Sequence, residues 1–116
     1  MMKAHNLHKM TCHLAAKMYN DADLVWDDLN IGTEVSLERD SDNPHDPYAV
    51  GVIFEKDGEK YLIGYLPKGE NQEIADMLDM GWGCCYRTVI SSKNPYVHPE
   101  QQIHITISIR KNENAK

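Results

Sequence analysis

The chain has 116 residues, of which 41% are hydrophobic, and it carries a formal net charge of −6 at pH 7. This length fits one domain with a single modest core, and the acidic charge argues against a protein that coats nucleic acids through a general basic surface. No apolar run approaches the roughly 20 residues of a membrane span, and residues 1–6 lack the apolar core of a signal peptide, so we expect a cytoplasmic protein with no membrane partner.

The hydrophobic pattern predicts short strands with two helices between them. In chain order the elements are a strand over Lys9–Tyr19, a helix over Asp21–Leu29, strands over Thr33–Arg39, Ala49–Glu55 and Lys60–Leu66, a helix over Glu70–Met80, and strands over Cys84–Ser91 and Gln101–Arg110. Asp57-Gly58 is a hairpin signal between the third and fourth strands. This count predicts a mainly β fold, a small six-stranded OB-like and partly open barrel with two short helices. We expect the domain to cover residues 9–110, with flexible ends at 1–8 and 111–116.

Four potential metal ligands, His5, His8, Cys12 and His13, lie near the start of the chain. Their spacing matches no common zinc-finger pattern, and a strand would direct Cys12 and His13 to opposite faces. The sequence therefore favours a frayed terminus over a metal site, with metal binding as the open alternative. The three cysteines form no disulfide framework, since Cys84 and Cys85 are adjacent.

Three aspartates, Asp40, Asp42 and Asp46, occupy one connection between strands and suggest a magnesium-dependent nuclease as another alternative. Alternate positions in such a loop need not converge on one ion, so this is the least favoured function. We expect neither catalysis nor a cofactor.

The same connection, Arg39–Val50, has the sequence RDSDNPHDPYAV. Each proline restricts the preceding residue to extended conformations, which predicts a stiff polar loop of the kind that often carries binding residues. The alternative is that these residues only form turns.

This loop, the later segment IGYLPK at Ile63–Lys68 and the helix after it together resemble the HIRAN domain. That family occurs at the front of certain SWI/SNF-type DNA translocases and as small free-standing bacterial proteins. The resemblance covers about His13 to Arg110. It implies an OB-like barrel that captures the 3′ end of single-stranded DNA. A motor activity is not implied, because the chain has no Walker-type phosphate loop.

The resemblance also implies a set of nucleic-acid-binding residues: Lys17, Tyr19, His45, Asp46, Tyr65, Lys68 and Tyr96. Tyr19 corresponds to a platform for the terminal base, and Tyr96 to a second stacking face. Asp46 corresponds to the acceptor for a free 3′-hydroxyl, because an ionised carboxylate only accepts hydrogen bonds and repels a 3′-phosphate. Lys68 corresponds to a phosphate ligand.

Two positions depart from the family pattern. Eukaryotic members tend to have an arginine where this chain has Met18, and relatives often have a tyrosine at the position of His45. Both changes weaken the expected contacts with DNA. We therefore expect a module that binds 3′-hydroxyl ends of single-stranded DNA in DNA repair or processing, with a DNA-processing protein as a possible partner. The alternative is a protein-interaction module with an acidic surface.

Overall fold

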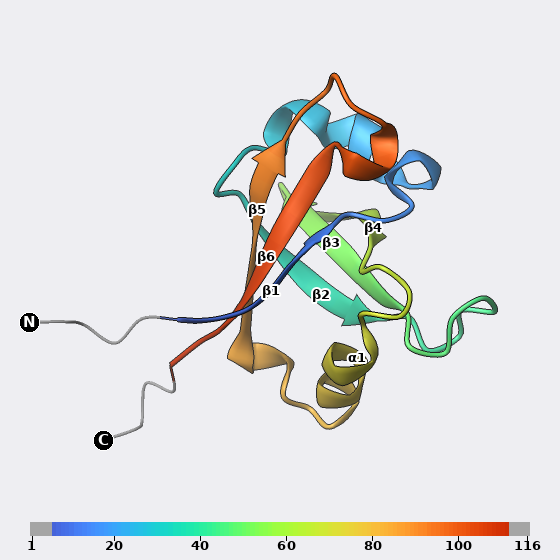
Figure 1. Cartoon of the computed structure of the whole chain (residues 1–116), viewed down its shortest axis with the longest axis vertical. Helices are drawn as coiled ribbons and strands as arrows, with labels where there is room; N and C mark the ends of the chain where they lie inside the picture. The colour runs from blue at the N-terminus through green and yellow to red at the C-terminus, as the bar shows by residue number, and fades with distance from the viewer. Residues whose placement is uncertain (1–5, 112–116) are drawn as a thin grey trace, which may run out of the picture.

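The computed structural model describes residues 6–111 as a mainly β domain (Figure 1). The strands are β1 (Leu7–His13), β2 (Glu34–Arg39), β3 (Val50–Lys56), β4 (Glu59–Tyr65), β5 (Tyr86–Lys93) and β6 (Ile103–Ile109). The helices are α1 (Gln72–Asp79) and the 3₁₀ segments η1 (Lys17–Tyr19), η2 (Asp21–Asp28), η3 (Gly83–Cys85) and η4 (Pro99–Gln101). The predicted six strands and two main helices, α1 and η2, are confirmed.

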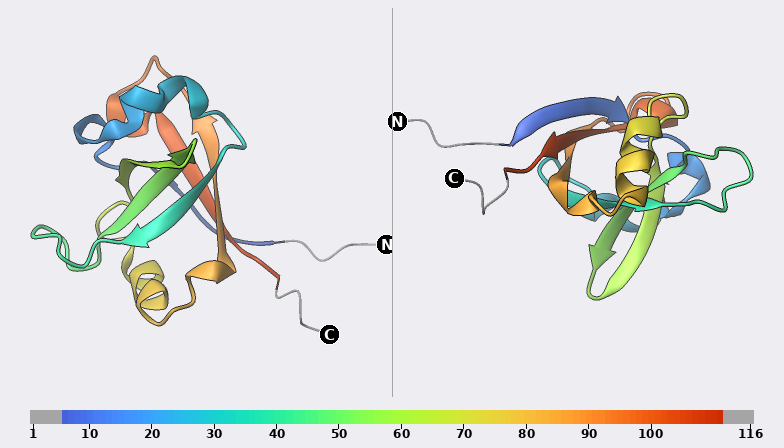
Figure 2. Two further views of the ribbon diagram at one scale, coloured as in Figure 1. Left: turned by 180° about the vertical axis from the view of Figure 1, so that it is seen from behind. Right: turned by 90° about the horizontal axis from the view of Figure 1, so that it is seen from below.

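The strands form one antiparallel sheet in the order β1-β6-β5-β2-β3-β4. The sheet coils until its two edges, β1 and β4, approach each other (Figures 1 and 2). An antiparallel bridge joins Tyr65, the last residue of β4, to Ala15, which follows β1 in the chain. The barrel is therefore partly open, as predicted.

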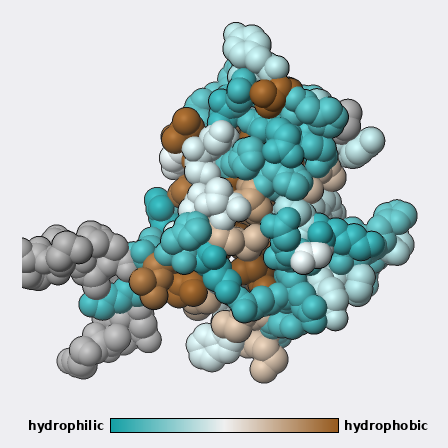
Figure 3. All heavy atoms as spheres, viewed as in Figure 1, coloured by the Kyte–Doolittle hydropathy of each residue, from teal (hydrophilic) through white to brown (hydrophobic). Residues whose placement is uncertain are grey.

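Alternating apolar residues on the inner face of the sheet make the core. On β6 the side chains of Ile103, Ile105 and Ile107 are completely buried, and so are Ile90 on β5 and Ile63 on β4, which belong to the same core cluster. Burial of a side chain of this size contributes about 1.5–3 kcal/mol, so these isoleucines add substantially to the stability of the domain. The face seen in Figure 3 is largely hydrophilic, with small hydrophobic areas. No helix in residues 6–111 is long and apolar enough to cross a membrane.

The first predicted strand is too long at its C-terminal end. β1 stops at His13, and Ala16 adopts a left-handed conformation with φ 57° and ψ 25°. A residue in this conformation cannot continue a strand, so Tyr19 lies on η1 instead of at a strand end. The helix predicted over Asp21–Leu29 is a 3₁₀ segment that is interrupted by Val25.

The predicted hairpin between β3 and β4 is confirmed. Asp57 and Gly58 both have positive φ, 54° and 82°, which is the backbone of a type I′ turn.

Candidate nucleic-acid site

A pocket of about 370 Å³ opens where the chain after β1 meets the end of β4. Three segments line it: residues 15–20, the Arg39–Val50 loop, and residues 65–68 that follow β4. Five of the seven residues expected in a nucleic-acid site are found here: Tyr19, His45, Asp46, Tyr65 and Lys68. The fold thus brings together two sequence motifs and a tyrosine that are far apart in the chain.

Arg39 fixes the shape of the loop that carries two of these residues. Its guanidinium donates to the carbonyl oxygens of Ala49 (2.8 Å) and Pro47 (3.0 Å), and its Nε donates to Asp79 of α1 (2.9 Å). Hydrogen bonds from a charged donor are among the stronger ones in proteins. Arg39, the last residue of β2, therefore connects that strand both to the C-terminal part of the loop and to α1.

Asn43 and Asp40 organise the interior of the loop. The side-chain oxygen of Asn43 accepts from the backbone amides of His45 (2.8 Å) and Asp46 (3.1 Å). Asp40 accepts from the Asn43 amide (3.2 Å) and from the Tyr65 hydroxyl (2.7 Å). Burial and the bond to Asp40 raise the pKa of Tyr65, so the phenol stays protonated as a donor. Asp40, a candidate magnesium ligand from the sequence, thus accepts hydrogen bonds within the domain, and Asn43 makes the turn-type contacts that are common for asparagine.

Asp46 is half-buried between the loop and α1. One carboxylate oxygen accepts from the backbone amide of Tyr48 (2.9 Å), and the other accepts from the side-chain amide of Asn71 (2.8 Å). Asn71 is 1% exposed, so this bond holds Asp46 against a rigid part of the domain. Each carboxylate oxygen has about two acceptor sites, so both oxygens keep capacity for a donor in the pocket.

Lys68 supplies the positive charge of the pocket. Its side chain is exposed, and its ammonium donates to the carbonyl oxygen of His45 at 3.0 Å. Seven other basic side chains of residues 6–111 lie within 4 Å of a carboxylate: Lys9, Lys17, Arg39, Lys56, Lys60, Arg87 and Arg110. The charge of Lys68, in contrast, is paired with a neutral carbonyl and remains available to an anion.

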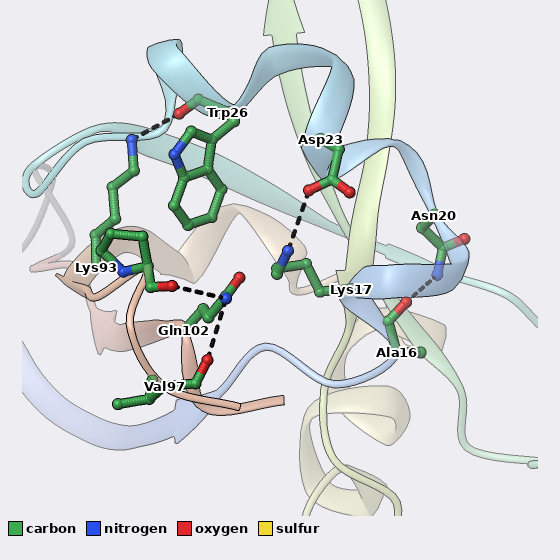
Figure 4. Close-up of polar contacts among 9 residues, drawn as sticks. Ala16, Lys17, Asn20, Asp23, Trp26, Lys93, Val97 and Gln102 are labelled. Atoms are coloured by element: carbon green, nitrogen blue, oxygen red, sulfur yellow. Dashed lines mark hydrogen bonds and ion pairs between the residues drawn. The ribbon is translucent and has the colours of Figure 1, made fainter. Parts of the chain in front are cut away.

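Tyr19 and Lys17 lie in the same turn but in opposite environments. Tyr19 is 81% exposed, whereas Lys17 is 3% exposed. The Lys17 ammonium is 3.2 Å from Asp23 Oδ1 and 5.0 Å from the centre of the Trp26 ring (Figure 4), a cation–π arrangement. Lys17 was expected among the nucleic-acid-binding residues, and this expectation is corrected: its ammonium is held in the interior and does not line the pocket.

Tyr96 is 93% exposed in the loop between β5 and β6 and does not line the pocket. Its loop lies at the same end of the molecule as η1 and η2 (Figures 1 and 2). The loop is ordered by Gln102, which donates to the carbonyl oxygens of Pro95 and Val97 (Figure 4). A stacking role for Tyr96 stays a prediction.

The structure describes three of the four candidate metal ligands near the start of the chain. Cys12 is buried, and burial, followed by the charge of Glu70, raises the pKa of its thiol to about 11, which disfavours the thiolate that metals bind. His8 Nε2 lies 3.0 Å from Thr11 Oγ1, and His5 is outside the described residues. In residues 6–111 no group of three or more His, Cys, Asp or Glu side chains is placed to hold a metal ion.

The apolar part of the pocket was not foreseen from the sequence. Ala15, Ala16, Ala49 and Leu66 line it beside the polar residues. Small alanines carry no chemical signal, so only the folded structure identifies them.

Comparison with known proteins identifies the family of this chain. A family model described as HIRAN domain matches residues 8–111. The Fanconi-associated nuclease 1 homolog of Oryza sativa subsp. japonica is 30% identical over 84 residues, which are 72% of this chain and 8% of that protein. The chain thus spans less than a tenth of that curated relative.

A crystal structure of a Lactobacillus plantarum protein matches with a TM-score of 0.71 at 20% identity, covering 91% of this chain and 97% of the other. This second likeness shows the fold alone. The family match covers nearly all of the sequence, and the chain belongs to the HIRAN domain family, which is known for DNA binding.

Proposed function

We propose that this domain binds the 3′ end of single-stranded DNA in the pocket between η1 and the Arg39–Val50 loop. The observation that carries the proposal is the presence of three complementary groups in one pocket: the exposed ring of Tyr19, the carboxylate of Asp46 and the ammonium of Lys68. The terminal base stacks on Tyr19, the 3′-hydroxyl donates to Asp46, and a phosphate binds Lys68. His45 and Tyr65 complete the walls.

The size of the pocket supports a strand end as the ligand. A volume of about 370 Å³ lies at the lower end of the range for small-molecule sites, roughly 300–1,000 Å³. Such a space suits one terminal nucleotide and is too small for a duplex. Asp46 adds selectivity, because a carboxylate accepts from a hydroxyl but repels a phosphate.

The proposed biological setting is DNA repair or another form of DNA processing. The curated relative is named as a nuclease, and a domain that recognises strand ends would direct such an enzyme to its substrate. In this proposal the domain itself binds and does not catalyse.

The test is a titration with two oligonucleotides that differ only in a 3′-hydroxyl or a 3′-phosphate, followed by fluorescence anisotropy. The native protein should prefer the hydroxyl by about tenfold, the factor that 1.4 kcal/mol gives. Asp46→Asn should bring the two affinities close together, because it removes the negative charge. Asparagine keeps an oxygen for the Tyr48 amide, and its new amino group can donate to the side-chain oxygen of Asn71 once that amide rotates.

The matched control is Asp42→Asn, which removes the same charge from an exposed position in the same loop. It should leave the preference unchanged. Equal affinity of the native protein for both ends would contradict the proposed role of Asp46.

A second function, a protein-interaction module, is favoured by one observation. The net charge is −6, and most basic side chains are already paired with carboxylates, so the surface is complementary to a basic partner. Undetectable binding of every oligonucleotide at low salt would support this function over DNA binding.

A further inference from the structure

Ala16 is a strained residue in the wall of the pocket. Its left-handed φ of 57° and ψ of 25° are unfavourable for a residue with a Cβ atom. Conformations of this kind persist only where neighbouring groups hold them, and they are common at binding sites. Ala16 lies directly between the Ala15–Tyr65 bridge and the turn that carries Tyr19.

Hydrogen bonds hold Ala16 on both sides. Its carbonyl oxygen accepts from the side-chain amide of Asn20 (2.7 Å; Figure 4) and from the backbone amide of Tyr19 (3.1 Å). Its amide donates to a carboxylate oxygen of Glu100 at 2.9 Å. Glu100 belongs to η4 and is 84 residues further along the chain, so this bond joins the β5–β6 connection to the pocket wall.

Glu100 is itself held in place. Its backbone amide donates to His98 Nδ1 (3.1 Å), which caps the start of η4, and its second carboxylate oxygen lies 3.6 Å from His13 Nε2. A carboxylate that accepts from a backbone amide makes one of the stronger protein hydrogen bonds. The bond is part-buried, so loss of the acceptor would leave the Ala16 amide poorly solvated.

We infer that Glu100 is a positioning residue of the nucleotide site, acting through Ala16 on Tyr19. This inference rests on the proposed function. Tyr19 is 81% exposed, so side-chain packing contributes little to its placement. The ring faces the pocket because the backbone from Ala15 to Asn20 has this conformation, and Glu100 stabilises it from outside. Without the carboxylate, Ala16 relaxes toward an ordinary conformation and the stacking surface moves away from the pocket.

The test uses a single-stranded oligonucleotide with 2-aminopurine as the 3′-terminal base and a free 3′-hydroxyl. Anisotropy reports affinity, and quenching of 2-aminopurine reports stacking. Glu100→Ala should reduce affinity by about three- to tenfold, in line with loss of one charge-assisted hydrogen bond, and should reduce the quenching. Glu100→Gln keeps an acceptor oxygen and should retain most of both signals. Glu59→Ala, an exposed glutamate in the β3–β4 hairpin, is the matched control and should change neither.

Two further measurements separate positioning from a general effect on the fold. In a double-mutant cycle, Glu100→Ala should have less than about a twofold effect when Tyr19 is already alanine, because both changes remove the same stack. Exchange of the Ala16 amide with solvent, followed by NMR, should accelerate in Glu100→Ala and not in Glu100→Gln.

Ala16→Gly in the Glu100→Ala background should recover quenching, because glycine adopts the left-handed conformation without strain. An equal loss of affinity with and without Tyr19, or unchanged Ala16 exchange in Glu100→Ala, would overturn the inference while the proposed function stands. Absence of oligonucleotide binding by the native protein would instead overturn the proposed function, and the inference with it.

Discussion

Single residues in the pocket divide into those held by side-chain contacts and those presented by the backbone alone. Asp46 is tied at both carboxylate oxygens, and Tyr65 is anchored through its hydroxyl to Asp40. Tyr19 is almost fully solvent-exposed. An exposed tyrosine adds little to the core, so its removal should lower the affinity for DNA and leave the stability of the fold unchanged.

Tyr19→Ala is expected to weaken binding of a 3′-hydroxyl oligonucleotide by about 1–3 kcal/mol, the range for a base–aromatic stack. Base preference should change little, because every base has a π-face. Isothermal titration calorimetry gives the affinity, and the thermal midpoint should stay within the error of the native value. Leu24→Ala removes another exposed apolar side chain, on η2, and serves as control. A lower thermal midpoint with unchanged affinity would instead make Tyr19 a structural residue.

At the scale of elements, the site depends on the contact between the two sheet edges. Ala15 and Tyr65 exchange backbone hydrogen bonds of 2.9 and 2.8 Å. This approach requires glycine at position 64: a Cβ there would lie 2.6 Å from Leu14 Cγ and 2.7 Å from the carbonyl oxygen of Ala15. Gly64 of the IGYLPK segment is therefore needed for steric reasons, since only a residue without a Cβ lets β4 approach the segment at Leu14 and Ala15 this closely.

Gly64→Ala should lower the free energy of unfolding by about 1–3 kcal/mol, the usual cost of overpacking, because the backbone oxygen cannot move without breaking the bridge. Gly51→Ala is the matched control on the neighbouring strand. Its nearest obstacle, at 2.9 Å, is the end of the flexible Leu62 side chain, so it should cost less. Urea unfolding of both variants checks this ranking, and a larger effect of Gly51→Ala would contradict it.

Elements with a strong local signal were predictable, and contacts between distant segments were not. Alternating isoleucines identified β6, and the Asp57-Gly58 turn identified the β3–β4 hairpin. The same alternation made the first predicted strand too long at its C-terminal end, because no local sequence signal indicates the left-handed conformation of Ala16. The burial of Lys17 against Trp26 and the bond between Ala16 and Glu100 both join residues that share no sequence motif. The two motifs and Tyr19 led to five residues that line the pocket. The structural roles of Arg39 and Asp40 were not predicted, because they depend on contacts with the distant residues Asp79 and Tyr65.

On the scale of the whole molecule, charge limits how DNA is held. Ion pairs within the domain engage most of its basic side chains, and an acidic net charge of −6 repels an extended phosphate backbone. Among the lysines and arginines of residues 6–111, Lys68 is the one that lines the pocket. Binding should therefore be modest in affinity and concentrated at the strand end.

This arrangement predicts a weak dependence of affinity on salt. For single strands the slope of log affinity against log salt is about −0.7 per phosphate contacted, so one contact through Lys68 gives a slope near −0.7. Lys68→Ala should bring the slope close to zero and weaken binding at low salt. Lys60→Ala, which removes an exposed lysine paired with Glu38 on the sheet, should leave the slope unchanged. The slope is measured by anisotropy titrations from 25 to 200 mM salt, a range on the order of one decade. Two results together would mean that DNA contacts another surface: a steep slope that persists in Lys68→Ala, and equal affinity for circular and linear single strands. A pocket that requires a strand end discriminates against a circular strand, whereas a general binding surface does not.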